Sequence, residues 1–151
     1  MQFEFFNGEY RISDAREQLD IASIHAYLRT SYWSPGIPLE IVQRAINNSL
    51  CFGVYHGTQQ VGFARMVSDF ATFAYLCDVY ILEAHRGLGL SKWLMGLIKQ
   101  HPQLQGLRRI MLATRDAHGL YRQYGFTAPA NPGIIMEVTV PNIYLKMQEK
   151  M

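Results

Sequence analysis

The chain has 151 residues, of which 49% are hydrophobic and 17% are charged, so we expect a single packed domain over residues 1–151 rather than a disordered polypeptide. The formal net charge is only +2, and Arg108-Arg109 is the only adjacent pair of basic residues. This scattered charge argues against nucleic acid and against a membrane surface as partners.

Targeting and metal-binding signals are absent from the sequence. The first residues lack a basic start followed by an apolar run, and no stretch reaches the roughly 20 apolar residues that span a bilayer, so we expect a cytoplasmic protein. Cys51 and Cys77 lie in apolar, strand-like runs and are expected as buried free thiols. Neither a zinc-ligand spacing nor a CxxC motif occurs, so no metal is expected.

The first half of the chain predicts one strand, two helices and a three-stranded meander. Residues 10–12 form the candidate first strand, and residues 19–31 and 39–48 have helical periodicity, separated by a break at Pro35-Gly36-Ile37-Pro38. Residues 51–55, 60–67 and 72–82 then predict strands joined by tight turns. Alternation places two sets of side chains on opposite faces of the last strand, namely Phe73, Tyr75, Cys77, Val79 and Ile81 against Leu76, Asp78 and Tyr80.

The second half predicts helices that cross over to further strands. Residues 89–100 and 117–124 read as helices, with Gly125 ending the second, and residues 109–114 read as a short buried strand. Residues from Phe126 onward, 133–140 and 143–147 are expected to supply the last strands. The order of elements predicts a mixed α/β sheet that is antiparallel first and then crossed over by helices.

A glycine-containing loop, Arg86-Gly87-Leu88-Gly89-Leu90-Ser91, joins the long strand to the next helix. Glycines at such a junction let backbone N–H groups converge at a helix start, which predicts a diphosphate-binding turn. The P-loop pattern is absent, and a dinucleotide fingerprint would need glycine where Lys92 stands. A purely structural turn that starts a helix remains an alternative.

Two segments resemble the GNAT superfamily of acyl-CoA N-acyltransferases. In residues 80–95, Arg86 and Gly89 match the first two fixed positions of its coenzyme A loop, and Ser91 stands where glycine or alanine is usual. Thirty residues on, residues 120–126 are similar to the superfamily's Leu-Tyr-three-residues-Gly-Phe signature. The resemblance implies a GNAT-like fold, with a mostly antiparallel central sheet splayed between the fourth and fifth strands and flanked by about four helices.

The resemblance also implies acetyl-CoA as co-substrate and assigns residues to it. Backbone contacts are expected from Val79 and Ile81 and from the turn residues Arg86, Gly87, Leu88, Gly89, Leu90 and Ser91. Thr114 stands where the superfamily often has an asparagine, and is a weaker candidate for contact with the coenzyme. Tyr121 matches the tyrosine that protonates the departing thiolate.

The residues that handle the acceptor are less sharply indicated. Asp78 is a lone carboxylate in an otherwise uncharged strand, so it is a candidate base or amine-holding group, and pairing with Arg65 is the alternative. Tyr32 and Trp33, with Phe73 as a weaker candidate, are expected to wall the acceptor site, although Trp33 is equally compatible with a core position.

The function expected is acetyl-CoA-dependent N-acetylation of a primary amine, in a small molecule or a peptide. A domain that binds acyl-CoA as a sensor without turnover is the first alternative, and an interaction module whose loop is a bare turn is the second. Members of the superfamily often dimerise, so a homodimer is also an expectation.

Overall fold

The computed structural model describes residues 3–149 and is built on one six-stranded sheet with the strands in chain order. Neighbouring strands are antiparallel from the first to the fifth, and the sixth runs parallel to the fifth. The strands are β1 (Glu4–Asn7), β2 (Tyr10–Ser13), β3 (Leu50–His56), β4 (Gln59–Ser68), β5 (Phe73–Ile81) and β6 (Arg109–Leu112).

The mixed sheet predicted from the sequence is confirmed, with one additional strand. β1 was missed because it is a short edge strand with mostly exposed side chains, so it carries no inward-facing apolar pattern. The predicted fourth and fifth strands are therefore β5 and β6. β6 is only partly buried, not buried as expected, because it lies at the edge of the sheet.

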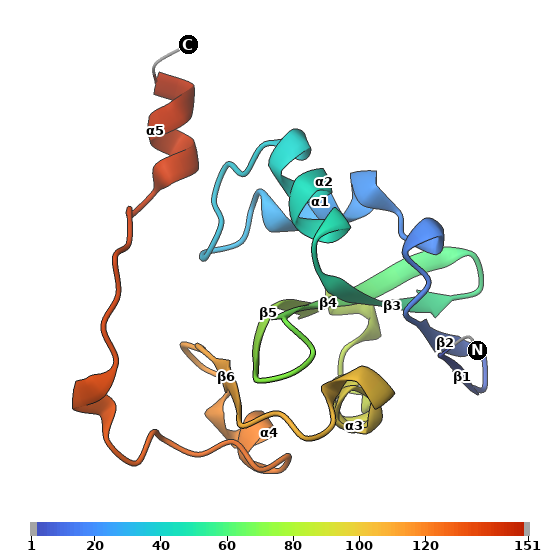
Figure 1. Ribbon diagram of the computed structural model, residues 1–151. Coiled ribbons are helices and arrows are strands. Elements are labelled where there is room, and N and C mark those ends of the chain that lie inside the picture. The colour runs from blue at the N-terminus through green and yellow to red at the C-terminus, as the bar shows by residue number, and fades with distance from the viewer. Residues whose placement is uncertain (1–2, 150–151) are drawn as a thin grey trace.

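Helices cover both faces of the sheet (Figure 1). α1 (Ile21–Leu28) and α2 (Leu39–Asn47) lie on one face, and α3 (Leu90–Gln100) and α4 (His118–Arg122) lie on the other. Asp20 caps α1 by accepting a hydrogen bond from the Ser23 N–H. Four short 3-10 helices complete the connections, at Arg16–Gln18, Glu83–His85, Pro102–Leu104 and Pro132–Ile134.

Each face of the sheet has its own hydrophobic core. Phe52, Leu94 and Met95 belong to the core beneath α3. Ile24 and Phe63 belong to the core beneath α1 and α2. β5 lies between these two cores, so each of its side chains faces one core or the other.

The C-terminal part differs from the prediction. Residues 133–140 form no strand, and residues 143–147 lie in a helix, α5 (Ile143–Glu149). Leu, Lys, Met, Gln and Glu all favour helix. A helix also brings Tyr144 and Gln148, four residues apart, to one side, where Tyr144 packs on the α1–α2 core and Gln148 donates to the Gly36 carbonyl.

Within residues 3–149, no helix is long and apolar enough to cross a membrane.

Candidate functional site

β5 separates from β6 halfway along its length. The two strands pair from Phe73 and Arg109 to Leu76 and Leu112, and β6 then ends while β5 continues to Ile81. On its other side β5 stays paired with β4 up to Ile81. Among residues 3–149, therefore, no strand neighbours residues 77–81 on the β6 side, and these residues present a strand edge there.

A β-bulge lies where the splay begins. The β4–β5 register jumps between Phe63 and Arg65, so that Asp78 and Val79 of β5 oppose the single residue Ala64. Asp78 has a positive φ of 54°, which is rare for a side-chain-bearing residue and most accessible to Asn and Asp. The extra residue bends β5 at this point and accounts for its divergence from β6.

The bulge also overturns the predicted alternation of β5. Leu76 and Ile81 share the core beneath α3, whereas Tyr80 belongs to the core beneath α1 and α2. The expectation that Leu76 and Tyr80 face the same way, and that Ile81 faces oppositely to Leu76, was wrong. The cause is physical: one extra residue shifts the two-residue period by one and exchanges the faces beyond Cys77.

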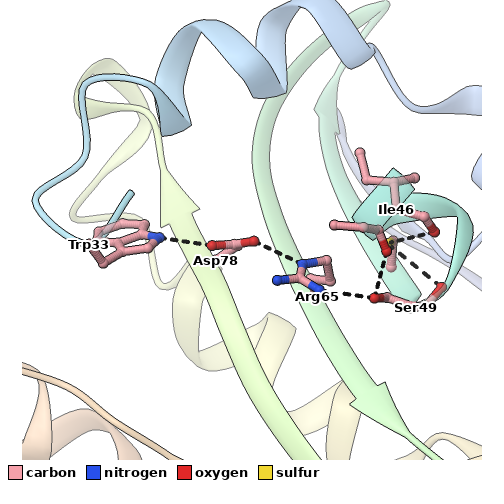
Figure 2. Close-up of polar contacts among 7 residues, drawn as sticks. Trp33, Ile46, Ser49, Arg65 and Asp78 are labelled. Carbon is pink, nitrogen blue, oxygen red and sulfur yellow. Dashed lines mark hydrogen bonds and ion pairs between the residues drawn. The ribbon is translucent and has the colours of Figure 1, made fainter. Parts of the chain in front are cut away.

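The Asp78 carboxylate is held by two donors from different parts of the chain (Figure 2). Its Oδ1 accepts from Trp33 Nε1 at 2.8 Å, and its Oδ2 accepts from Arg65 Nε at 2.8 Å. Arg65 also donates through Nη1 to Ser49 Oγ at 3.0 Å. Burial by itself would lower the pKa of Arg65, but the Asp78 carboxylate outweighs it and the pKa is raised, so the guanidinium stays charged. The pairing of Asp78 with Arg65 that the sequence left as an alternative is present.

The splay opens into a cavity of about 830 Å³. Five segments line it: the chain from α1 to residue 33, residues 75–81 of β5, the turn that carries Arg86 and Ser91, the loop that follows β6, and α4. The predicted site residues among its lining are Tyr32, Trp33, Asp78, Val79, Ile81, Arg86, Ser91, Thr114 and Tyr121.

The glycine-containing turn closes one end of the free β5 edge. Gly87 and Gly89 both have φ near 79°, and Gly89 is the residue that precedes α3. A Cβ built on either glycine would meet nothing within 4 Å, so glycine is required there for the backbone angle and not for space. Arg86 is turned back toward the strand, where its Nε donates to the Ile81 carbonyl at 2.8 Å.

The backbone of this turn fits a diphosphate. Within residues 3–149, none of the N–H groups of residues 87–92 donates a backbone hydrogen bond. These groups belong to the turn and to the first turn of an 11-residue helix, where N–H groups and the helix dipole favour an anion. Leu88 is exposed and Leu90 is in the core, so any contact with a ligand here would come from the backbone.

Tyr121, on α4, lines the same cavity and also a second cavity beside β6. Burial raises the pKa of its phenol to about 12, with contributions from Tyr32 and Asp116, so the hydroxyl stays protonated at neutral pH. In the described part of the chain, only Tyr55 and Tyr80 have enclosed hydroxyls without a hydrogen bond. The Tyr121 hydroxyl is therefore not fully enclosed.

Aromatic residues wall the mouth of the cavity. The Tyr32 and Trp33 rings meet edge to face at 5.0 Å, and the Arg115 guanidinium lies 3.8 Å from the centre of the Tyr32 ring. Phe73, in contrast, lies at the far end of β5 and is not among the lining residues. Thr114 lines the cavity, but its Oγ1 accepts from the Ala117 N–H and so holds the turn that precedes α4.

Asp116 is a lining residue that the sequence did not single out. It is exposed, and within residues 3–149 it forms no hydrogen bond or ion pair, unlike Asp78. Its place directly before α4, five residues ahead of Tyr121, is the sequence signal that identifies it. In the same described range, no cluster of three or more His, Cys, Asp or Glu side chains is placed to hold a metal ion.

A free strand edge beside a glycine-containing turn, in one cavity with a largely buried phenol, has a shape suited to an extended ligand lying along the sheet. Comparison with known proteins identifies the class. A family model described as the acetyltransferase (GNAT) family matches residues 13–126, and the chain belongs to this family.

Individual relatives agree with this assignment. A solved GNAT-family protein from Xanthomonas campestris pv. campestris superposes with a TM-score of 0.88 and 54% identity, over 89% of this chain and 96% of that one. A protein from Gibberella zeae, named provisionally as an acetyltransferase, is 34% identical over an alignment of 137 residues, and the match covers 76% of each chain. A Clostridium acetobutylicum acetyltransferase structure solved with acetyl-CoA has the same fold, with a TM-score of 0.63 and 18% identity over 86% of this chain and 94% of that one.

Proposed function

We propose that the chain is an acetyl-CoA-dependent N-acetyltransferase acting on a primary amine of a small molecule or a peptide. The observation that carries the proposal is a single cavity whose lining includes Arg86 and Ser91 of the turn, the free edge of β5 and Tyr121. Bound acetyl-CoA would supply the thioester that an amine attacks.

The residues that would hold the coenzyme act mainly through their backbone. The unengaged N–H groups of residues 87–92 are suited to its pyrophosphate, and the α3 dipole adds to them. The free edge at Val79 offers strand-like hydrogen bonds to the amide-bearing pantetheine arm. Since the Ile81 carbonyl already accepts from Arg86, we expect Val79 to contribute more than Ile81.

The side chains around the reacting end divide the remaining tasks. Tyr121 keeps a proton on its oxygen at neutral pH and is suited to giving it to a basic thiolate. The two carboxylate oxygens of Asp78 accept hydrogen bonds, one from Trp33 and one from Arg65. Asp78 is therefore suited to holding the bulge and the Trp33 side chain in place. Asp116 has its carboxylate unengaged and is suited to attracting a cationic amine, whose proton is then lost to solvent in the open cavity.

The test is release of free thiol from acetyl-CoA in the presence of a panel of primary amines and peptides. Amine-dependent thiol release, with acetylated product identified by mass, is the expected result. If acetyl-CoA raises the melting temperature but no amine in the panel promotes thiol release, the sensor alternative takes its place. If acetyl-CoA leaves the melting temperature unchanged, the turn is purely structural.

A further inference from the structure

Two opposite charges in the cavity beside β5 have no ion-pair partner in the described part of the chain. The charged side chains that line this cavity are those of Asp78, Arg86, Arg115 and Asp116. Asp78 is paired with Arg65, and Arg86 is turned onto the Ile81 carbonyl. Between residues 3 and 149, the side chains of Arg115 and Asp116 form no hydrogen bond or ion pair. These two neighbours are therefore the charges that the cavity offers to a ligand.

The Arg115 guanidinium is held in place by an aromatic ring. Its Cζ lies 3.8 Å from the centre of the Tyr32 ring, and the Arg115 backbone N–H donates to the Tyr32 hydroxyl at 3.4 Å. A contact with the π face of a ring uses none of the N–H donors of a guanidinium. Those donors stay available to a carboxylate, which a guanidinium binds in bidentate fashion.

Both charges lie near the phenol of Tyr121. Tyr32 and Asp116 contribute to the raised pKa of Tyr121, so the ring that carries Arg115 and the free carboxylate are both close to that phenol. Tyr32 also meets the Trp33 ring edge to face, and the Trp33 indole N–H is bonded to the bulge of β5 (Figure 2). The Arg115 guanidinium is thus supported by contacts that lead back to the sheet.

We propose that Arg115 binds a carboxylate of the acceptor, so that the acceptor is a small molecule carrying both a primary amine and a carboxylate, as an amino acid does. This inference rests on the proposed function and narrows its substrate class. Asp116 attracts the ammonium group of such a molecule and Arg115 binds its carboxylate, so two adjacent residues of opposite charge match the two charges of the ligand. The phosphates of the coenzyme have their own site at the N–H groups of residues 87–92 and do not require Arg115.

The test measures kcat/KM for thiol release with a panel of amino acids, the carboxamide of each, and the corresponding amine that lacks the carboxyl group. The ratio of the wild-type value to the Arg115→Gln value is taken for each acceptor, because this ratio cancels the intrinsic reactivity of the amine. We expect amino acids to be the best acceptors and to lose about tenfold or more in kcat/KM, while the other two sets change by less than about twofold.

Arg44→Gln is the matched control, because it removes the same charge from an exposed position on α2, away from the cavity lining. It should leave all the ratios near one. Arg115 is exposed, so its substitution is expected to preserve the fold, and the melting temperature of each variant verifies this.

The outcomes separate this inference from the proposed function. If carboxamides or simple amines are acetylated as efficiently as amino acids, or if Arg115→Gln changes all three sets alike, the inference is overturned and the proposed function stands. A selective loss of affinity for coenzyme A in Arg115→Gln also overturns it, because the guanidinium then serves the coenzyme.

If no compound promotes thiol release, the proposed function fails and binding decides the inference alone. Calorimetry then titrates the same amino acids into the protein saturated with coenzyme A. Binding that Arg115→Gln weakens by about tenfold supports a carboxylate site at Arg115. Absent binding, or equal binding by wild type and variant, contradicts it.

Discussion

Tyr121 is 8% exposed and its hydroxyl is not fully enclosed, so its oxygen can be removed with little change in packing. We expect Tyr121→Phe to lower kcat by about 100-fold or more, as loss of a general acid does, and to leave the dissociation constant for coenzyme A unchanged. Steady-state kinetics and calorimetry measure the two quantities.

Tyr124→Phe is the control, because it removes a hydroxyl that donates to the Lys92 carbonyl at 2.7 Å outside this cavity. Tyr124→Phe should lower the free energy of unfolding by about 1 kcal/mol and leave kcat unchanged. Comparable kcat values for Tyr121→Phe and the wild type would rule out the assigned role.

Substitution of Asp78 is expected to change the stability of the fold. In Asp78→Asn, the amide has only one acceptor oxygen for two donors, Trp33 Nε1 and Arg65 Nε, and it leaves a largely buried guanidinium without its counter-charge. We expect a loss of about 3 kcal/mol in the free energy of unfolding, measured with urea. Asn tolerates the positive φ, so backbone strain does not contribute. An unchanged stability with a lower kcat would instead indicate a free catalytic base.

Asp116 offers a contrasting carboxylate. It is exposed and unengaged within the described chain, so Asp116→Asn should change stability by less than about 0.5 kcal/mol. For a cationic amine we expect KM to rise about fivefold, which corresponds to about 1 kcal/mol of lost attraction, and the effect should shrink at high salt. Glu40→Gln removes an equal charge from α2, away from the cavity lining. A similar KM increase in this control would show that only net charge matters.

At the scale of elements, the site was predictable where its geometry is local. The glycine turn follows from residues adjacent in sequence, because a positive φ at Gly87 and Gly89 and a following helix are short-range features. The bulge at Asp78 was not predictable, since it depends on a one-residue mismatch between β4 and β5 that neither strand shows alone. The Trp33–Asp78 bond joins residues 45 positions apart and follows only from the packed fold.

The C-terminal elements show the same limit. An alternating apolar run at residues 134–140 satisfies the strand pattern, but a strand needs a neighbour, and within the described single chain none pairs with it. The pattern therefore predicts the capacity to pair, but not whether a neighbouring strand is present. In residues 143–147 the choice between strand and helix was decided by contacts with the Gly36 loop.

The turn before α3 allows a test in which stability and binding separate. In Gly89→Ala, the added methyl group meets no neighbour, so the cost is that of a positive φ, about 1–2 kcal/mol of folding stability. We also expect at least a tenfold weaker affinity for coenzyme A, because a shift of the backbone turns N–H groups away from the pyrophosphate.

Gly106→Ala is matched to it, with φ of 75° and open space around its Cβ, but it lies in the loop before β6. It should lose similar stability and keep the affinity. If both variants bind coenzyme A like the wild type, the turn does not hold the pyrophosphate.

At the scale of the whole molecule, the fold shields groups that ionise at alkaline pH, among them the buried Cys51 and Tyr55 and the half-buried Cys77, which was expected to be buried. Burial raises the pKa of Cys51 from 9.0 to about 12, against the opposing charges of Arg65 and Arg16. Burial likewise raises the pKa values of Cys77 and Tyr55 to about 12. In each case the unfolded chain releases its proton first. The free energy of unfolding is therefore unaffected by these groups below about pH 9, and it falls progressively as the pH rises toward 12.

Cys51→Ala isolates one of these groups, because Cys51 is 3% exposed and its thiol lies beneath α2. The substitution lowers stability at all pH values through the lost packing, so the informative quantity is the slope. We expect the free energies of unfolding of wild type and variant, measured in reducing buffer, to run parallel up to about pH 8 and then to converge. Between about pH 9 and pH 11, the wild type should fall more steeply by up to about 1.4 kcal/mol per pH unit, the contribution of one proton. Parallel curves over that range would mean that the folded thiol ionises as readily as the unfolded one, and that the core beneath α1 and α2 is open to solvent.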